Sequence, residues 1–331
     1  MNGADLPLIA VDAMGGDNAP AEIVAGALLA RRDGLARVAL VGDRERIVPL
    51  LGDQTDVEIV HAAAEIAMDA SPASAARGSA GTSLGEAVEL VRSGHAHAVV
   101  SAGNSGAFLA VALIRLRTIP GIARPAIGAV LPGRRGPVVL CDAGANVDCK
   151  PEWMAQFGVM GSAYARAALG VANPRVGIVS VGEERSKGNA QTIEAAALLE
   201  GLPLNFIGNV EGKDILVNAA DVVVADGFVG NVILKTAEGS GIYFSEVLRE
   251  SYELAPLLGK LGGLFSRSVF NVMRKRLDYS TYGGAPLLGL RGNCVVAHGR
   301  SDRVAIRNAI RQAAAVAAAD LVGSIGAVCA A

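Results

Sequence analysis

A pair of glycines follows the first apolar run of the chain and is the first feature that could bind a ligand. The run Leu8–Asp12 predicts a strand, Gly15 and Gly16 end it, and Pro20 precedes a helical pattern. Glycines lack a Cβ, so a ligand can approach their backbone, and the start of the next helix offers N–H groups to an anion. We expect a loop that binds phosphate or another polar ligand. Its polar side chains are those of Asp12, Asp17 and Asn18.

Two familiar nucleotide-binding motifs are absent from the sequence. The turn lacks the G-x-G-x-x-G pattern of dinucleotide-binding folds, and no G-x-x-x-x-G-K-[ST] phosphate loop occurs in the chain. A tight turn without a ligand is the alternative interpretation. Two aspartates and an asparagine crowded onto one glycine turn favour a binding site over that alternative.

Glycine together with Asp, Asn or Ser follows several other apolar runs. In open α/β sheets ligands bind at the carboxyl ends of the strands, so these loops predict one polar cleft along that edge. Each loop taken alone is equally well explained as an ordinary turn. The candidate substrate-binding residues on these loops are Asn104, Ser105, Asp142, Asn146, Asp226 and Gly230, with His298, for which a structural hydrogen bond is an equal alternative.

Two side chains are candidates for catalysis. Lys187 lies just before a predicted helix whose N-cap is Asn189, and an ammonium group beside helix N–H groups suits phosphate. A solvated loop lysine is the alternative. Asn231 begins another predicted helix, where its amide could donate to a developing oxyanion, although it could also be an N-cap.

Other reactive residue types make weaker candidates. Cys141 ends a strand, but a buried inert thiol is the commoner case, and no base lies beside it in sequence. His95 and His97 are two potential metal ligands without a third. Ser105 lacks the G-x-S-x-G context of a nucleophile. None of these residue types makes a strong case for a metal site or a covalent nucleophile.

The elements that must position these residues alternate between strands and helices. Apolar residues make up 51% of the 331 residues and aromatics only 4%, which favours βα layers over a β-sandwich. Most predicted strands are apolar throughout, as in a mainly parallel sheet buried on both faces. A hairpin is expected around Arg134–Gly136. The predicted strands are 8–12, 38–42, 57–60, 98–101, 125–131, 138–141, 176–181, 204–207, 221–225, 286–290 and 294–297, and the main helices are 106–116, 152–169, 192–199 and 232–248.

Charge and cysteine content restrict the partners. The formal net charge is −2, so a general nucleic-acid partner is not indicated. The four cysteines are widely separated, and the amino terminus does not resemble a signal peptide, which predicts a reduced, cytoplasmic protein. No apolar run is long enough to span a bilayer.

The segment 254–277 differs from the rest of the chain. Its apolar residues repeat at helical spacing and its charged residues are all basic, as in a helix that lies on a membrane surface. An apolar stripe that belongs to the core or to a dimer interface is the alternative. The candidate residues for membrane or partner contact are Leu257, Leu261, Phe265, Arg274, Lys275 and Arg276.

Taken together, the motifs resemble those of the bacterial phosphate acyltransferases of the PlsX type. The resemblance covers nearly the whole chain and keeps the order of the motifs. One loop departs from it, because Ser71-Pro72 stands where the family usually has Lys-Pro, and Arg77 is the only cation there. The matching motifs are those at 11–20, 101–106, 141–146, 182–184, 187–189, 226–231, 282–289 and 297–299.

The resemblance implies an enzyme that converts acyl-[acyl carrier protein] and phosphate into acyl phosphate for phospholipid synthesis. It implies a Rossmann-like, three-layer α/β/α fold with a mainly parallel sheet, related to isopropylmalate dehydrogenase. We expect one domain over 1–331, from which an amphipathic helical hairpin protrudes as a tip at 251–277. It further implies a homodimer on the inner face of the cell membrane that supplies a glycerol-3-phosphate acyltransferase.

The chemistry of this reaction fits the candidate residues. A thiolate leaves readily and phosphate is nucleophilic without a base, so orientation and charge stabilisation are the main requirements. Lys187 is then a phosphate-side group and Asn231 a carbonyl-side donor, and the reaction is expected to need no metal and no organic cofactor. The rival hypotheses are a decarboxylating NAD-dependent dehydrogenase of related fold and a non-catalytic membrane scaffold for lipid enzymes.

Overall fold

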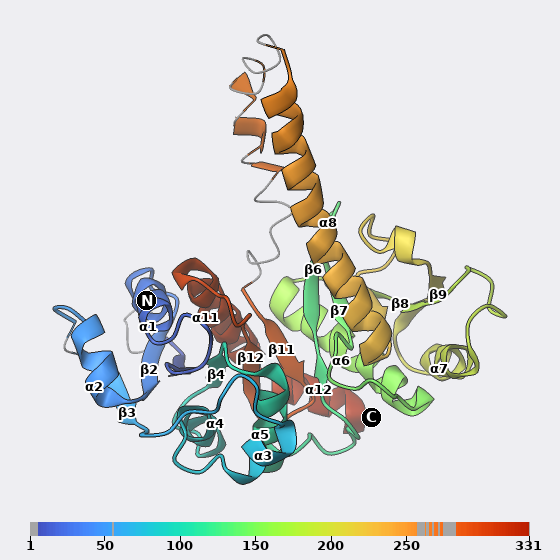
Figure 1. Ribbon diagram of the computed structural model, residues 1–331. Helices are drawn as coiled ribbons and strands as arrows, with labels where there is room; N and C mark the ends of the chain where they lie inside the picture. Colours follow the sequence, from blue (N-terminus) through green and yellow to red (C-terminus); the bar gives the residue numbers. More distant parts are fainter. Residues whose placement is uncertain are drawn as a thin grey trace.

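Two β-sheets form the centre of the computed structural model, which describes residues 6–54, 56–256, 262, 265, 266, 268–270, 272, 273 and 283–330 (Figure 1). The prediction of an α/β fold is confirmed, whereas the prediction of one sheet is wrong. The predicted strand 125–131 consists of two strands that separate at Gly128 and belong to different sheets. Apolar residues show that a strand is buried but not which neighbour it pairs with, so the sequence concealed this division.

The first sheet has seven strands in the order β3-β2-β1-β4-β12-β11-β5. Strands β3 to β12 in this order are parallel, while β11 is antiparallel to both of its neighbours. Consequently β1, β4 and β12 end at one edge of the sheet. The bounds are β1 Leu8–Asp12, β2 Arg37–Gly42, β3 Glu58–His61, β4 Ala98–Ser101, β5 Ala126–Ile127, β11 Ala285–Leu288 and β12 Asn293–Val296.

The second sheet has five strands in the order β6-β7-β10-β8-β9. The expected hairpin is confirmed as the antiparallel pair β6–β7, and the remaining neighbours are parallel. Strands β7, β10 and β8 therefore also end at a common edge. The bounds are β6 Ala129–Gly133, β7 Gly136–Cys141, β8 Arg175–Val179, β9 Asn205–Val210 and β10 Val222–Val224.

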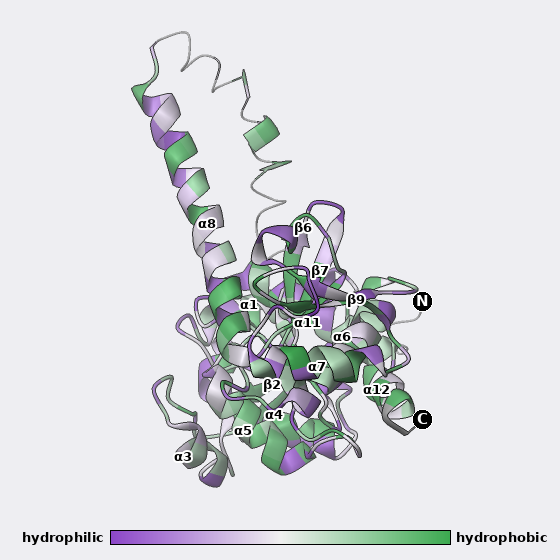
Figure 2. Ribbon diagram, turned by 90° about the vertical axis from the view of Figure 1, so that its right-hand side faces the viewer, coloured by the Kyte–Doolittle hydropathy of each residue, from purple (hydrophilic) through white to green (hydrophobic). Residues whose placement is uncertain are grey.

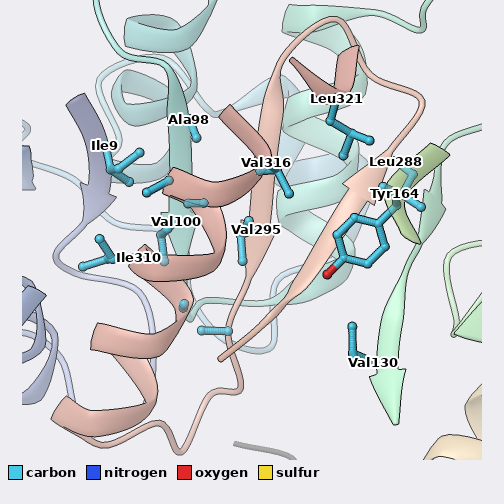
Figure 3. Packing of buried hydrophobic residues seen from close by; sticks show 14 of the residues in the cluster. Ile9, Ala98, Val100, Val130, Tyr164, Leu288, Val295, Ile310, Val316 and Leu321 are labelled. Carbon is cyan, nitrogen blue, oxygen red and sulfur yellow. The ribbon is translucent and has the colours of Figure 1, made fainter. Parts of the chain in front are cut away.

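Helices cover both faces of the sheets. Alternate residues of β1 enter different cores: Ile9 and Val11 belong to the largest cluster, and Ala10 to a second one. Figure 3 shows the largest cluster, in which Tyr164 and Ile310 lie among strand residues. The helices are α1 Ala21–Arg32, α2 Arg44–Ile47, α3 Pro72–Arg77, α4 Ser83–Arg92, α5 Ser105–Leu116, α6 Pro151–Leu169, α7 Ala190–Glu200, α8 Gly227–Leu254, α11 Arg303–Ala318 and α12 Leu321–Ala330, with 3₁₀ turns at Val48–Leu50 and Gly212–Asp214.

Helix α8 projects far from the sheets (Figures 1 and 2). It has 28 residues and is longer than the predicted helix 232–248 at both ends. Its middle contains the sequence Gly239-Ser240-Gly241, and a Cβ on Gly239 would meet no atom within 4 Å. No helix among the described residues is long and apolar enough to cross a membrane.

The predicted contact segment is only partly described. Leu257, Leu261, Arg274, Lys275 and Arg276 lie outside the described residues. Phe265 is described, and 83% of it is exposed. The rings of Tyr252 and Phe270 contact each other edge to face, with centroids 5.1 Å apart. This contact joins the end of α8 to the segment that follows it.

Candidate functional site

A cleft of about 730 Å³ lies between the two sheets, beside the carboxyl ends of their strands. One wall comes from the first sheet and α11, the opposite wall from the loop after β7 and from α8, and the floor from β5 and β6, of which β6 contacts β11. The lining residues are Ser105, Gly283–Ala285, Val296–His298, Arg300–Asp302 and Ala305; Ala143, Gly144, Asn231, Leu234, Lys235, Glu238 and Ile242; and Ile127, Ala129 and Val130.

Three of the predicted site residues line this cleft: Ser105, Asn231 and His298. Ser105 is the first residue of α5, so it sits beside the helix N–H groups. His298 accepts a hydrogen bond at Nδ1 from the Arg300 N–H (3.2 Å). A neutral His298 therefore carries its proton on Nε2, where it is a donor.

Asn231 lies in the second turn of α8, and its interpretation as an N-cap is wrong. The N-cap is Asp226, whose carboxylate accepts hydrogen bonds from the N–H groups of Phe228 and Val229 (both 2.9 Å). The Asn231 side chain is exposed and forms no hydrogen bond within the described part of the chain. Its amide is thus available to a ligand in the cleft.

Two glycines fix the start of α8 against the neighbouring loop. A Cβ on Gly227 would lie 2.4 Å from the Asn146 carbonyl oxygen, and one on Gly230 would lie 1.9 Å from that of Asp142. Real Cβ atoms do not approach so closely, so only glycine permits this packing. Gly230 therefore lets α8 pack closely on the loop after β7, and this packing determines where Asn231 lies.

Asp142 and Asn146 hold their own loop together. The carboxylate of Asp142 accepts hydrogen bonds from the N–H of Ile127 (2.9 Å), three loop N–H groups and the Asn146 amide (3.0 Å). Burial raises the pKa of Asp142, although these hydrogen bonds act in the opposite direction. The Asn146 amide also donates to the Pro125 carbonyl (2.8 Å). Both polar groups are engaged within the protein, and the loop they stabilise presents Ala143 and Gly144 to the cleft.

Asp12 joins two strand ends of the first sheet. Its buried carboxyl group accepts a hydrogen bond from the Ser101 hydroxyl (2.6 Å), which in turn accepts one from the Gly103 N–H (3.1 Å). Burial raises the pKa of Asp12. A Cβ on Gly15 would lie 2.5 Å from this carboxylate, so the turn folds directly over it.

The rest of the glycine turn supports the cleft wall. Gly16 has a φ of +113° and allows the Asp17 N–H to donate to the Gly299 carbonyl (2.8 Å). The Asn18 amide donates to the carbonyls of Arg300 and Ser301 (both 3.3 Å). The turn therefore positions the segment 298–302, which lines the cleft.

Asn104 has a similar supporting role beside Ser105. Its Oδ1 accepts from the Ala107 N–H (2.9 Å), and its Nδ2 donates to the carbonyls of Met68 (2.7 Å) and Ala70 (3.1 Å). It thereby caps α5 and ties the divergent loop at 68–78 to the helix that carries Ser105.

Lys187 does not line the cleft. It lies in the exposed loop between β8 and α7, whose predicted N-cap is confirmed because Asn189 accepts from the Thr192 N–H (2.8 Å). The Lys187 carbonyl accepts from the Ser180 hydroxyl (2.9 Å) and the Asn209 amide (3.2 Å). Its backbone is held, while within the described residues its ammonium group forms no ion pair.

Several cleft residues escaped the sequence analysis. Arg300, Ser301 and Asp302 follow His298 at a strand end, which was a usable signal. The spacing 231, 234, 235, 238 and 242 also marks one face of a helix, but it predicts burial and ligand contact equally well. Lys235 and Glu238 on this face are paired (2.8 Å).

The weaker candidates are accounted for by the structure. Burial raises the pKa of the Cys141 thiol far above its ordinary value, so a thiolate is disfavoured there. His95 pairs with Glu58 (2.7 Å), and His97 accepts from the Leu8 N–H (3.1 Å). Within the described ranges, no group of three His, Cys, Asp or Glu residues could hold a metal ion.

The fold of the chain is also found in solved structures of α/β proteins. A phosphotransacetylase from Streptococcus pyogenes superposes with a TM-score of 0.65 at 18% identity, over 95% of this chain and 94% of that one. A 4-hydroxythreonine-4-phosphate dehydrogenase from Klebsiella pneumoniae gives a TM-score of 0.55 at 14% identity, over 95% and 98%. The same fold thus occurs in transferases and in dehydrogenases, so the fold alone does not identify the reaction.

Sequence relatives distinguish between these two classes of enzyme. The family model described as "Fatty acid synthesis protein" matches residues 8–323. Phosphate acyltransferases from Desulforudis audaxviator and Nostoc punctiforme are each 48% identical, over 96% and 92% of this chain and 94% and 91% of theirs. The chain therefore belongs to the phosphate acyltransferase family of fatty acid and phospholipid synthesis.

Proposed function

We propose that the enzyme transfers an acyl group from an acyl carrier protein thioester to inorganic phosphate, and that it does so in the cleft between the sheets. The observation that carries this proposal is the arrangement of Ser105, Asn231 and His298 around one cleft with an apolar floor. Such a site offers polar groups to phosphate and to a carbonyl, together with space for an acyl chain.

The Asn231 amide acts on the carbonyl side of the reaction. Attack of phosphate on the thioester carbonyl places negative charge on its oxygen, and a fixed N–H donor stabilises that charge. Because Asp226 caps α8, the Asn231 side chain is not needed for helix capping. Collapse of the intermediate expels a thiolate with an ordinary pKa of about 8.5, which needs little acid assistance.

Phosphate binds beside the first turn of α5 in this proposal. Ser105 lies at the helix N-terminus, and Arg300 and the donor Nε2 of His298 belong to the same cleft. We assign Lys187 to the phosphate side as well. This role requires the loop between β8 and α7 to bring the ammonium group to the cleft when substrate binds.

The proposed partners follow from the family and from the exposed surface of α8. Acyl carrier protein supplies the thioester, and a glycerol-3-phosphate acyltransferase uses the acyl phosphate. The exposed apolar side chains of α8 that do not line the cleft include Tyr243, Phe244 and Leu254. They support a homodimer that contacts the inner face of the cell membrane through the projection, in a protein otherwise expected in the cytoplasm.

The test is product analysis with purified enzyme. Incubation with octanoyl- or hexadecanoyl-acyl carrier protein and phosphate should yield acyl phosphate and the carrier thiol in equal amounts, detected by mass spectrometry. Omission of phosphate should abolish both products. Carrier release without acyl phosphate would contradict the proposal, and substrate-dependent reduction of NAD would instead support the dehydrogenase alternative.

A further inference from the structure

The cleft contains far more apolar surface than phosphate transfer requires. Polar side chains lie at the strand ends, at the start of α11 and on α8, whereas the floor is apolar and α8 adds Leu234 and Ile242. Small residues leave the space open between them. The apolar lining consists of Ile127, Ala129, Val130, Ala143, Leu234, Ile242, Ala285, Val296, Ala297 and Ala305.

Helix α8 gives this apolar surface a direction. From Asn231 the lining residues continue through Leu234 to Ile242, a distance of about 16 Å along the helix axis at 1.5 Å per residue. Ile242 is 56% exposed, so its side chain presents apolar surface at this end of the cleft. The groove thus begins at the proposed carbonyl donor and ends at the base of the projection.

The charged residues on this helix face do not block an apolar ligand. Lys235 and Glu238 pair with each other at 2.8 Å. The Glu238 side chain is only 15% exposed, so the pair forms part of the wall and leaves no unpaired carboxylate facing the groove. An apolar chain can lie along Leu234 and Ile242 without burying a lone charge.

We propose that this groove binds the acyl chain of the substrate, with its first carbons beside Asn231 and its later carbons against Leu234 and Ile242. The inference rests on the proposed function, because that function makes a long unbranched acyl group the ligand. The volume of about 730 Å³ falls within the range of about 300–1,000 Å³ for small-molecule sites. Chain-length preference then depends on the size of the side chains in the groove.

The test compares the binding of two inert acyl phosphate analogues, octanoyl phosphonate and hexadecanoyl phosphonate, by calorimetry. Each buried methylene strengthens binding about fourfold, so the longer probe should bind the unmodified enzyme much more tightly. Leu234→Trp fills space for at least two methylenes and should reduce the ratio of the two affinities by about tenfold or more. Ala305→Leu, from the opposite wall, should also reduce it.

Val232→Trp is the matched control, because Val232 lies on the same helix, is exposed and does not line the cleft. It should leave the affinity ratio unchanged. Equal affinities of the unmodified enzyme for both probes would overturn the inference. An unchanged ratio in variants that retain the parent melting temperature would do the same. If Leu234→Trp fails to fold, Ala305→Leu decides.

The binding experiment separates this inference from the proposed function. Formation of octanoyl phosphate by the unmodified enzyme tests the reaction without requiring the outer groove. If no octanoyl phosphate forms, the proposed function fails while the affinity ratio still decides where the chain binds. If it forms and the ratio does not respond to either substitution, only the acyl-chain site is wrong.

Discussion

The start of α8 and the loop before α7 carry the two proposed catalytic side chains, but they hold them very differently. Asn231 follows two glycines that pack directly on the loop after β7, so the start of its helix is held against that loop. Lys187 is exposed, and its hydrogen bonds within the described residues hold only its backbone: its N–H donates to the Glu184 carbonyl, and its carbonyl accepts from Ser180 and Asn209. In the proposed mechanism, the carbonyl-side group is therefore prepositioned, whereas the phosphate-side group has to be brought to the cleft during binding.

Gly230→Ala should produce the largest effect, because its Cβ would lie 1.9 Å from the Asp142 carbonyl oxygen. We expect a loss of about 3 kcal/mol or more in the free energy of unfolding, measured by urea denaturation. Gly239→Ala on the same helix is the control, since nothing lies within 4 Å of its Cβ. It should stabilise the protein by about 0.5–1 kcal/mol. Equal effects of the two substitutions would show that α8 is not fixed in the way described.

Asn231→Ala should lower kcat by about 100-fold to 1,000-fold and change KM less, because an oxyanion donor acts mainly in the transition state. Steady-state kinetics with the acyl carrier protein thioester measure both constants. The melting temperature should stay close to that of the parent enzyme, since Asp226 supplies the helix cap. A rise in KM alone would reduce Asn231 to a substrate-binding group.

Lys187→Ala should lower turnover by about 100-fold without a change in stability, because the side chain is exposed. Lys187→Arg keeps the charge and should recover part of the activity if the ammonium only neutralises phosphate. The assay is turnover over a range of phosphate concentrations. Near-normal turnover at saturating phosphate would remove Lys187 from the mechanism and leave the phosphate to the groups that already line the cleft.

The smallest expected effect is on stability and concerns an ion pair in the cleft wall opposite α8. Arg303 is the first residue of α11 and pairs with Glu22 of α1 (2.5 Å). The Arg303 guanidinium lowers the pKa of Glu22 to about 2 from its ordinary 4.5. A lowered pKa means that the pair stabilises the folded state above pH 4.5 and that this stabilisation is lost as the pH falls towards 2.

Glu22→Gln should therefore cost no more than about 1 kcal/mol at neutral pH, as for other surface pairs. The difference in melting temperature between parent and variant should shrink as the pH falls from 4.5 towards 2. Glu45→Gln, which alters another glutamate in the first turn of a helix, is the control. A difference that widens in acid would contradict the assigned sign.

The sequence predicted the elements well and their assembly less well. Strand bounds such as Leu8–Asp12 and the hairpin at 134–136 follow from local apolar runs and turns. The division into two sheets depends on Gly128, whose N–H donates to the Pro286 carbonyl (2.9 Å) far away in sequence. Local patterns contain no information about such pairing.

The site shows the same limit. Residue type correctly marked the strand-end loops, and Ser105, Asn231 and His298 do meet in the cleft. Residue type could not separate Asn231 from Asn146 or Asn104, because the same amide serves a ligand or a backbone carbonyl according to its neighbours. Only the hydrogen bonds seen in the structure show that the amides of Asn146 and Asn104 bind backbone carbonyls and so stabilise the loops around the cleft.

The sequence Gly239-Ser240-Gly241 is the place where α8 is expected to bend most easily. These residues lie between the turns of Asn231 to Glu238, which line the cleft, and the part that projects towards Leu254; Ile242, the last lining residue of the helix, follows directly after them. Packing does not demand glycine at position 239, and glycine–serine runs are where helices bend most easily. A rod of 28 residues, about 42 Å long, would otherwise transmit every tilt of its tip to its base. Under the proposed function, a bend at this sequence would let the outer half follow the angle of a surface while the turn that carries Asn231 keeps its alignment.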